Sequence, residues 1–383
     1  MDVFALAAHL TALILLALLT FRLWRNLRFL RGVQNLNSPL RDFPLVSILV
    51  PARNEARAIA ACIESLAGQN YRNFEIIALN DQSSDETGLL LDKLVAKVPN
   101  LTVLHGSEAP PTGWNGKSYA CQRLAEAATG DWLLFTDADT VHAPNSIGQG
   151  ISQMRALNVS LLSAMPKQVT KRWSEQVLVS FILDFLPLLA LDLPGLPLDV
   201  SSSVAANGQY LLVHAASYRA LGGHEAIFDA LVDDFALARL FRENRHPIAL
   251  VSGVHMLACR MYHTAGEVWQ GFSKNILLGL EASSAKKHLA GWALAFTWGY
   301  ACLFVLPFYH VLLPDQRLWA LLEIGWLALL RGMINRQLER PLSEILTTPL
   351  AAWSVMALGL NALRRRMRRG QVRWKGREYG LMH

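Results

Sequence analysis

Short apolar runs alternate with amphipathic stretches between Val46 and about Gly253. The apolar runs with the length and composition of buried strands are Val46–Val50, Phe74–Leu79, Leu101–Leu104 and Trp132–Phe135. The amphipathic segments between them are typical of helices and lie near residues 56–68, 84–97 and 117–128. Strands that alternate with helices in this way predict a doubly wound α/β domain with a largely parallel sheet.

Polar clusters follow the predicted strands directly. They read PARNE at residues 51–55, NDQSSD at 80–85 and TDAD at 136–139. In open α/β sheets, ligands bind at the carboxyl ends of the strands. The three clusters therefore predict one binding site along one edge of the sheet.

Asp137 and Asp139 are candidate metal ligands. They stand one residue apart at the exit of the run Trp132–Phe135, where two carboxylates repel each other unless both face solvent or share a cation. Mg2+ prefers one or two carboxylates together with phosphate oxygens, so the spacing favours one divalent ion bridged to a substrate's phosphates. A strand followed by a solvated acidic turn is the structural alternative.

Apolar segments of membrane-spanning length lie at both ends of the chain. Val3–Phe21 fits one bilayer crossing and is followed by arginines, which predicts an uncleaved anchor with the remainder of the chain in the cytoplasm. Leu289–Leu313 carries no charged residue and is the strongest C-terminal candidate, followed by Leu318–Leu330 and Ile345–Leu363. Because a basic tail favours the cytoplasm, only an even number of these can cross. We expect the first and one other to span and the third to lie at the interface.

Trp173–Val200 has a different texture, rich in Leu and Pro and interrupted by Asp184 and Asp192. The segment is too broken to predict a spanning helix. An interfacial segment, or an apolar wall for a lipid substrate, is one interpretation. A buried core helix followed by a loop is the other.

Composition agrees with membrane association and excludes a broad nucleic-acid surface. Hydrophobic residues make up 52% of the 383 residues and charged residues 17%, and the mean hydropathy is +0.25. The net charge of +6 is concentrated in residues 364–383, which carry eight Lys/Arg and one Glu. Such a tail favours anionic lipid headgroups. The four cysteines have no CxxC spacing and predict free buried thiols rather than disulfides or a zinc site.

A set of motifs in a fixed order resembles a family 2 glycosyltransferase with the GT-A fold. They are VSILVPARNE (46–55), NDQSSDET (80–87), TDADT (136–140), NGQ (207–209) and VDDFAL (232–237). GWNGK at 113–117 and the apolar ends resemble the bacterial branch that acts on lipids, including hopanoid-associated and carotenoid glycosyltransferases. The resemblance implies a mixed, largely parallel sheet with helices on both faces, plus transmembrane helices at both ends. It implies an anchor over residues 1–31, a GT-A domain over 45–275, membrane or interfacial helices over 276–363 and a basic tail over 364–383.

The resemblance also implies residue roles. Asp81 would bind the base or ribose of the nucleotide, and Asp137 and Asp139 would hold Mg2+ or Mn2+ against the diphosphate, with Asp139 as the more direct ligand. Asp234 would be the general base that deprotonates the acceptor, beside Asp233, which stands where the family usually has Glu. The other donor-binding candidates are Pro51, Arg53, Glu55 and Lys117, and further candidates are His263, Lys274 and Asn207.

Several of these residues have structural alternatives. The loop of Asp81 reads as an Asx-turn, and Glu55 could sit in the first turn of the following helix. Lys117 could cap its helix, and Asp233 with Asp234 could complement a helix dipole. The Gln-x-x-Arg-Trp motif of many processive members is missing from the sequence, which argues against a polymerase.

The sequence thus predicts a membrane-bound, inverting glycosyltransferase. It would move a single sugar from a UDP- or GDP-sugar to a lipid hydroxyl. Transfer to a polyprenyl phosphate is an alternative in which the anionic acceptor needs no base. A non-catalytic membrane scaffold is a further alternative, against which the retained carboxylates argue, because crowded carboxylates are costly to keep without a function.

Overall fold

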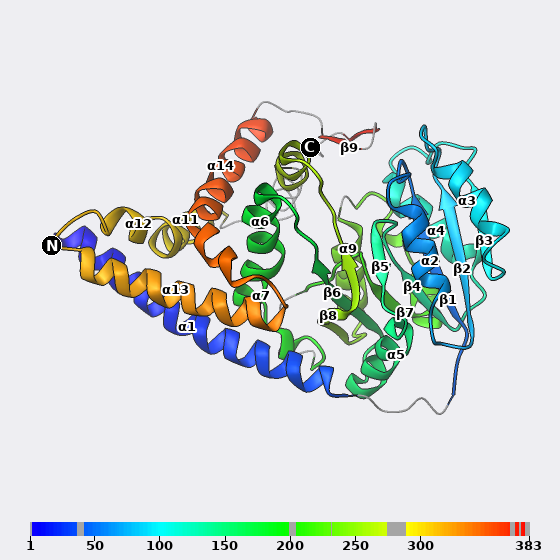
Figure 1. Cartoon of the computed structure of the whole chain (residues 1–383), viewed down its shortest axis with the longest axis horizontal. Coiled ribbons are helices and arrows are strands. Elements are labelled where there is room, and N and C mark those ends of the chain that lie inside the picture. Colours follow the sequence, from blue (N-terminus) through cyan, green and yellow to red (C-terminus); the bar gives the residue numbers. More distant parts are fainter. Residues whose placement is uncertain are drawn as a thin grey trace. The chain divides into compact units, whose positions relative to one another are not determined.

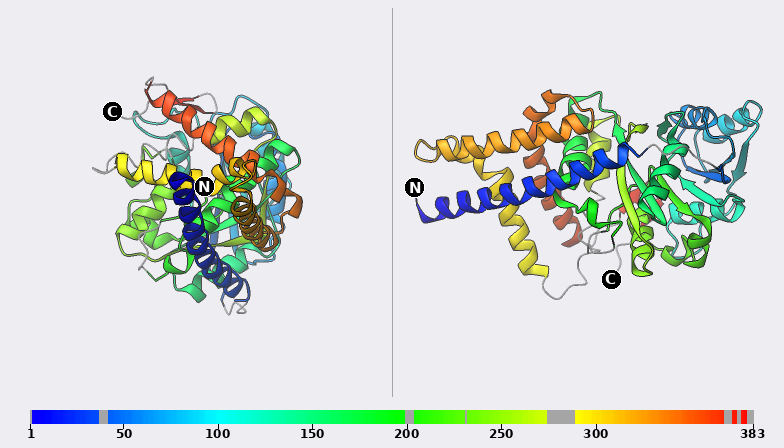
Figure 2. Two further views of the ribbon diagram at one scale, coloured as in Figure 1. Left: turned by 90° about the vertical axis from the view of Figure 1, so that its left-hand side faces the viewer. Right: turned by 90° about the horizontal axis from the view of Figure 1, so that it is seen from below.

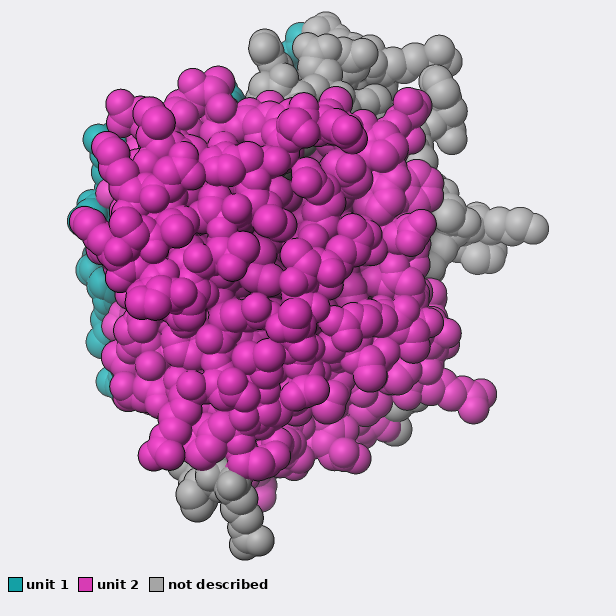
Figure 3. Space-filling view, turned by 90° about the vertical axis from the view of Figure 1, so that its right-hand side faces the viewer, with its two compact units in different colours: residues 1–27, 170–191, 262–383 teal, residues 28–169, 192–261 magenta. Residues whose placement is uncertain are grey.

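The computed structural model describes residues 2–36, 42–198, 204–230, 232–273, 289–367, 372–374 and 377–379. The chain forms two compact units (Figures 1 and 3). The helical unit comprises Met1–Leu27, Thr170–Leu191 and Tyr262–His383, and the sheet unit comprises Arg28–Val169 and Asp192–Met261.

The sheet unit is built on an eight-stranded sheet with the order β3-β2-β1-β4-β7-β6-β8-β5. The strands are β1 (Val46–Ala52), β2 (Phe74–Asn80), β3 (Leu101–His105), β4 (Trp132–Phe135), β5 (Thr140–His142), β6 (Leu161–Gln168), β7 (Leu211–His214) and β8 (Ile248–Cys259). β3, β2, β1 and β4 run parallel, as do β6 and β8. β7 pairs antiparallel with β4 and β6, and β5 with β8. The strands predicted from the sequence are thus the parallel half of a mixed sheet.

Helices cover both faces of this sheet. The helices of the sheet unit are α2 (Ile59–Ala67), α3 (Thr87–Val95), α4 (Gly116–Ala127), α5 (Ser146–Leu157), η2 (Leu193–Gly195), α8 (Ala215–Ala220), η3 (Glu225–Ile227) and α9 (Asp233–Glu243). Ile48 and Val50 of β1 share one apolar core with α2, α3 and α5. Because neighbouring residues of a strand point to opposite faces, Leu49 faces the other side, where α4 contacts β1, α8 contacts β7 and α9 contacts β8.

The helical unit contains helices long and apolar enough to cross a membrane. Its elements include most of α1 (Val3–Gln34; Figure 2), α6 (Trp173–Val179), η1 (Ser180–Phe185), α7 (Leu186–Ala190), α11 (Leu289–Phe304), α12 (Leu306–His310), α13 (Arg317–Gln337), η4 (Leu342–Thr347), α14 (Thr348–Met367) and the antiparallel pair β9 (Val372–Trp374) and β10 (Arg377–Tyr379). In the described part of the chain, four segments qualify as candidate spans: Val3–Gln34, Trp173–Ala190, Arg317–Gln337 and Leu342–Ala362.

Two of the sequence expectations about these helices differ from the structure. Trp173–Ala190 is a continuous helical segment of 18 residues rather than a broken one, because α6 passes through the π-helical turn η1 into α7 without a break. The run Leu289–Leu313, in contrast, is interrupted at Val305, between α11 and α12. Pro307 is the cause, since proline has no N–H to donate to the preceding helical turn and its ring crowds that turn. The described part of this run is therefore not among the candidate spans.

Several buried charged side chains of the helical unit have charged or polar partners. His9 of α1 lies 2.8 Å from Glu323 of α13. Arg340 lies 2.9 Å from Glu344 and 3.6 Å from Asp184 of η1. Arg331 donates to the carbonyl oxygen of Ser180 at 3.1 Å. Unpaired charges in an apolar helix bundle are expensive, so this pairing explains how such residues are accommodated in apolar helices.

Candidate active site

The loops after β1 and β2 are tied together at one edge of the sheet, as the sequence predicts. Arg53 Nη1 donates to the carbonyl oxygens of Asp81 at 2.7 Å and of Gln82 at 3.3 Å. Asn54 and Gln82 have φ values of 54° and 53°, a left-handed conformation that asparagine tolerates well. Asn54 Oδ1 accepts from the N–H of Ser84 at 2.8 Å. Asp81 is held between these loops and is only 7% exposed.

Glu55 and Pro51 flank this junction. Pro51 is part of β1, and Glu55 precedes α2 rather than lying in its first turn, because the helix begins at Ile59. The N–H of Glu55 donates to Thr87 Oγ1 at 2.8 Å, and this contact joins the first loop to the start of α3.

The turn after β4 presents Asp137 and Asp139 above a buried hydrogen-bond network. Thr136 Oγ1 donates to the carbonyl oxygen of Gln209 at 2.8 Å and lies 2.9 Å from His142 Nε2. Thr140 Oγ1 donates to the carbonyl oxygen of Asp137 at 2.8 Å. Burial lowers the pKa of His142 to about 3, so this imidazole is neutral and acts as a hydrogen-bonding support. The backbone that carries the two carboxylates is thereby held in one conformation.

Lys117 connects the turn after β4 to the start of α9. Its Nζ lies 2.8 Å from Asp137 Oδ1 and 3.5 Å from Asp233 Oδ2. The helix cap is Asn115, whose side chain accepts from the N–H of Lys117 at 2.8 Å, so the capping role considered for Lys117 belongs to Asn115. The positive end of the helix dipole destabilises a cation in the first turn of a helix. The carboxylates around Lys117 offset that cost.

Asp233 and Asp234 are the first two residues of α9, and both carboxyl groups interact with the charge of Lys117. Asp234 Oδ2 accepts from the N–H of Gly208 at 2.7 Å, and its Oδ1 accepts from the N–H of Phe235 at 2.7 Å. A Cβ added at Gly208 would lie 3.1 Å from Lys117 Nζ and 3.4 Å from Asp234 Oδ2. A Cβ here would crowd the ammonium group of Lys117, and glycine leaves room for the backbone to lie close to it.

The two adjacent carboxyl groups differ in pKa because their surroundings differ. Burial, and then the neighbouring charge of Asp233, raise the pKa of Asp234 to about 6. Burial acts to raise the pKa of Asp233 as well, but the charges of Lys117 and His224 outweigh it and the pKa is lowered. Burial opposes the charge of Lys117, yet Asp137 and Asp233 raise the pKa of this lysine well above its ordinary value. Near neutral pH the cluster thus holds an ionised Lys117–Asp233 pair beside a weaker acid.

The remaining candidates from the sequence are Asn207, His263 and Lys274. Asn207 Oδ1 accepts from the N–H of Gln209 at 2.9 Å, which shapes the turn before β7. His263 belongs to the helical unit, where its N–H donates to Glu267 Oε2 at 2.7 Å. Lys274 lies outside the described residues.

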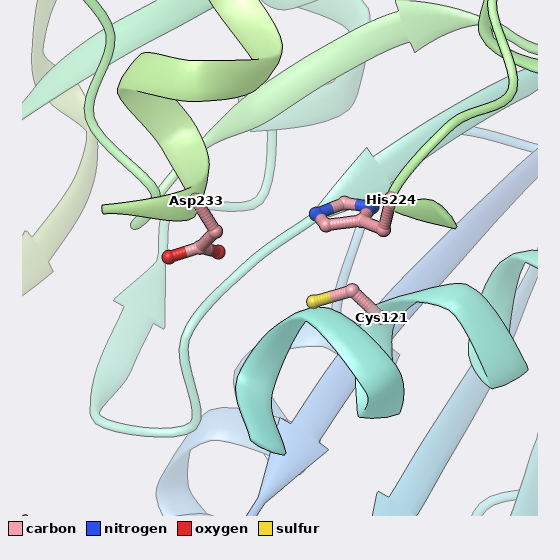
Figure 4. Close-up of side chains that lie close together, drawn as sticks. All are labelled: Cys121, His224 and Asp233. Atoms are coloured by element: carbon pink, nitrogen blue, oxygen red, sulfur yellow. The ribbon is translucent and has the colours of Figure 1, made fainter. Parts of the chain in front are cut away.

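Sequence reasoning assigned Asp233 to the site but missed two residues beside it, Cys121 and His224. These three side chains each offer a ligand atom, and the three atoms lie within 4.8 Å of one another (Figure 4). His224 and Cys121 carry no motif and stand in different elements, so no spacing could reveal them. All four cysteines are free and buried, as expected. Cys259, beside Asp139, was also missed; burial first, and then the charge of Asp139, raise the pKa of its thiol.

Comparison with known proteins identifies the class of this site. Residues 47–194 match the family model Glycosyl transferase family 2. Residues 47–194 form a glycosyltransferase domain of family 2, and the fold is of the GT-A type.

Two relatives are described as 4,4'-diaponeurosporenoate glycosyltransferases. The one from Staphylococcus haemolyticus is 27% identical over 263 residues, which cover 67% of each chain. The one from Staphylococcus aureus strain MRSA252 is 27% identical over 244 residues, which cover 63% of each chain. This chain thus matches about two thirds of the length of these relatives.

A solved structure shares the fold over most of the chain. It is the mannosyltransferase PcManGT from Pyrobaculum calidifontis in complex with GDP-Man and Mn2+. The TM-score is 0.50 and the identity 15%, and the match covers 93% of this chain and 99% of that one.

Proposed function

We propose that this protein transfers a single sugar from a nucleotide-diphosphate sugar to a lipid acceptor, with inversion at the anomeric carbon. The observation that carries the proposal is the bridge made by Lys117, which lies 2.8 Å from Asp137 and 3.5 Å from Asp233. It joins the acidic turn after β4, suited to a donor diphosphate, to the acid pair that opens α9, suited to deprotonating an acceptor. Both halves of a transfer reaction are thereby in one place.

Asp137 and Asp139 would hold a divalent cation, Mg2+ or Mn2+, with the donor. Their carboxylate oxygens are the hard ligands that these ions prefer. When bound, the ion supplies positive charge where the nucleoside diphosphate departs. Lys117 adds a fixed positive charge on the same side. Arg53 and Asp81, at the junction of the first two loops, would bind the nucleoside.

Asp234 would accept the proton of the acceptor hydroxyl. The oxygen forms its bond to the anomeric carbon as the bond from that carbon to the diphosphate breaks, and the proton passes to Asp234. A pKa raised by burial to about 6 suits a base that works near neutral pH. Each of its oxygens accepts one backbone N–H and keeps a further lone pair for this proton.

The acceptor would be a lipid of the carotenoid or hopanoid type. The support is the name of the relatives, 4,4'-diaponeurosporenoate glycosyltransferase, and the candidate spans of the helical unit. That name denotes a carboxylate, so a second candidate is transfer to a lipid carboxylate, which is already anionic and needs no base. The spans fit a protein of the inner membrane, with the sheet unit on the cytoplasmic side where nucleotide sugars are made.

The direct test is transfer by the detergent-purified full chain. UDP- and GDP-sugars are supplied with Mn2+ or Mg2+ and with carotenoid and hopanoid alcohols and acids, and the products are analysed by mass spectrometry. We expect one sugar per acceptor, and NMR of the product should give the anomeric configuration opposite to that of the donor. Products with several sugars, or with retained configuration, would contradict the proposal.

Removing the charge of Lys117 should weaken donor binding. In Lys117→Met, the loss of a charged contact to the diphosphate is expected to raise KM for the donor by roughly tenfold to a hundredfold. The measurement is initial rate against donor concentration at saturating Mn2+. Lys93→Met is the matched control, because Lys93 is an exposed lysine of α3. A donor KM equal to that of the control would remove Lys117 from the donor site.

A further inference from the structure

Three side chains from separate elements lie close together, and one of them belongs to the acid pair that opens α9. Cys121 belongs to α4, His224 precedes η3, and Asp233 is the first residue of α9. Their sulfur, imidazole nitrogen and carboxylate oxygen lie within 4.8 Å of one another, and Figure 4 shows them pointing into one space. Cys121 and His224 are each 1% exposed, so protein atoms enclose this space on their side.

The imidazole of His224 is oriented by Tyr218. Tyr218 Oη lies 2.7 Å from His224 Nδ1 and accepts from the backbone N–H of His224 at 3.0 Å. With Nδ1 engaged, Nε2 is left facing the space shared with Cys121 and Asp233 (Figure 4). An outer partner on the second ring nitrogen is the arrangement that orients a metal-binding histidine.

We propose that Cys121, His224 and Asp233 form a metal site for a thiophilic divalent cation such as Zn2+, separate from Asp137 and Asp139. One sulfur, one imidazole nitrogen and one carboxylate oxygen are ligands that Zn2+ takes, with water as a fourth. Mg2+ selects oxygen ligands and would not compete here. With metal–ligand bonds of about 2.0–2.3 Å, the three atoms need to close by roughly 1 Å. The thiol proton is released to solvent as the sulfur binds.

Occupation of this site should inhibit the transferase. Asp233 Oδ2 lies 3.5 Å from Lys117 Nζ, and an ion on Asp233 would withdraw this carboxylate from the lysine. It would also place positive charge beside Asp234 and oppose the uptake of a proton there. This consequence rests on the proposed function, whereas binding of the metal does not.

Cobalt(II) provides a spectroscopic probe of the site. The full chain in detergent is titrated with Co2+ in the presence of excess Mg2+, and thiolate-to-cobalt absorption in the near ultraviolet is recorded. We expect the band in wild type and in Cys259→Ala, which removes the thiol beside Asp139, and its loss in Cys121→Ala. Zn2+ should abolish the band by displacing cobalt. A wild type without the band, a band that persists in Cys121→Ala, or one that vanishes in Cys259→Ala would overturn the site.

A second measurement needs no variant and remains decisive if Cys121→Ala does not fold. X-ray absorption at the zinc edge of the zinc-loaded wild type should show one sulfur among nitrogen and oxygen ligands. A shell of nitrogen and oxygen alone would overturn the site.

Inhibition is tested with the transfer assay at a fixed Mn2+ concentration, each variant being normalised to its own rate without zinc. The Zn2+ concentration for half inhibition should be at least about tenfold higher in Cys121→Ala than in wild type. Equal concentrations would show that zinc inhibits at another site and would contradict inhibition through Cys121. A cobalt band without sugar transfer would support the metal site and contradict the proposed function. Sugar transfer without the band would support the proposed function and contradict the metal site.

Discussion

Asp234→Asn is expected to lower kcat by roughly 10²–10⁴-fold with a hydroxyl acceptor, the range that one general base contributes. The amide keeps the size of the side chain and can still accept the N–H of Gly208, but it cannot take a proton. The measurement is kcat for sugar transfer. Asp229→Asn is the control, because Asp229 is an exposed acid a few residues upstream.

The same residue should set the acid limb of the pH profile. The pKa of Asp234 is raised to about 6, so the base is ionised above that pH and the wild-type rate should fall as the pH drops through it. In Asp234→Asn this limb should disappear from the residual activity. A variant that keeps most of its activity would exclude a hydroxyl acceptor and favour an anionic one, a lipid carboxylate or a polyprenyl phosphate.

Asp139→Ala is expected to abolish metal-dependent cleavage of the donor. A bound cation contributes several kcal/mol to stabilisation of the departing diphosphate, so the rate should fall by roughly 10²–10⁴-fold. The measurement is slow release of nucleoside diphosphate without acceptor, titrated with Mn2+ and with Mg2+. Calorimetry of Mn2+ binding in the presence of nucleoside diphosphate reports the lost ligand directly.

Asp131→Ala is the matched control, because Asp131 is an exposed carboxylate just before β4. Its rate and Mn2+ dependence should equal those of the wild type. If Asp139→Ala retained the wild-type Mn2+ dependence, the cation would have to be held by other residues, and the role of the acidic turn would be lost.

The local pattern of apolar and polar residues was sufficient to predict the strands of the parallel half of the sheet. Val46–Val50 and Trp132–Phe135 are short apolar runs bounded by polar turns, and they form β1 and β4 close to the expected bounds. β6 and β7 escaped prediction because their antiparallel pairing is set by neighbours distant in the chain rather than by their own composition. Similarly, the apolar run Leu289–Leu313 predicts a single span by length, but Pro307 interrupts it.

The sequence alone determined which chemical groups the protein carries, because these groups belong to short local motifs. The motifs are the acidic turn with Asp137 and Asp139 and the acid pair Asp233 and Asp234. Folding decided how those groups are paired. Lys117 reaches both acidic motifs only because β1 and β4 lie side by side and α4 packs against β1. The cluster of Cys121 with His224 likewise depends on the packing of separate elements. Distances between residues far apart in sequence are set by packing of the whole core, so no local pattern could contain them.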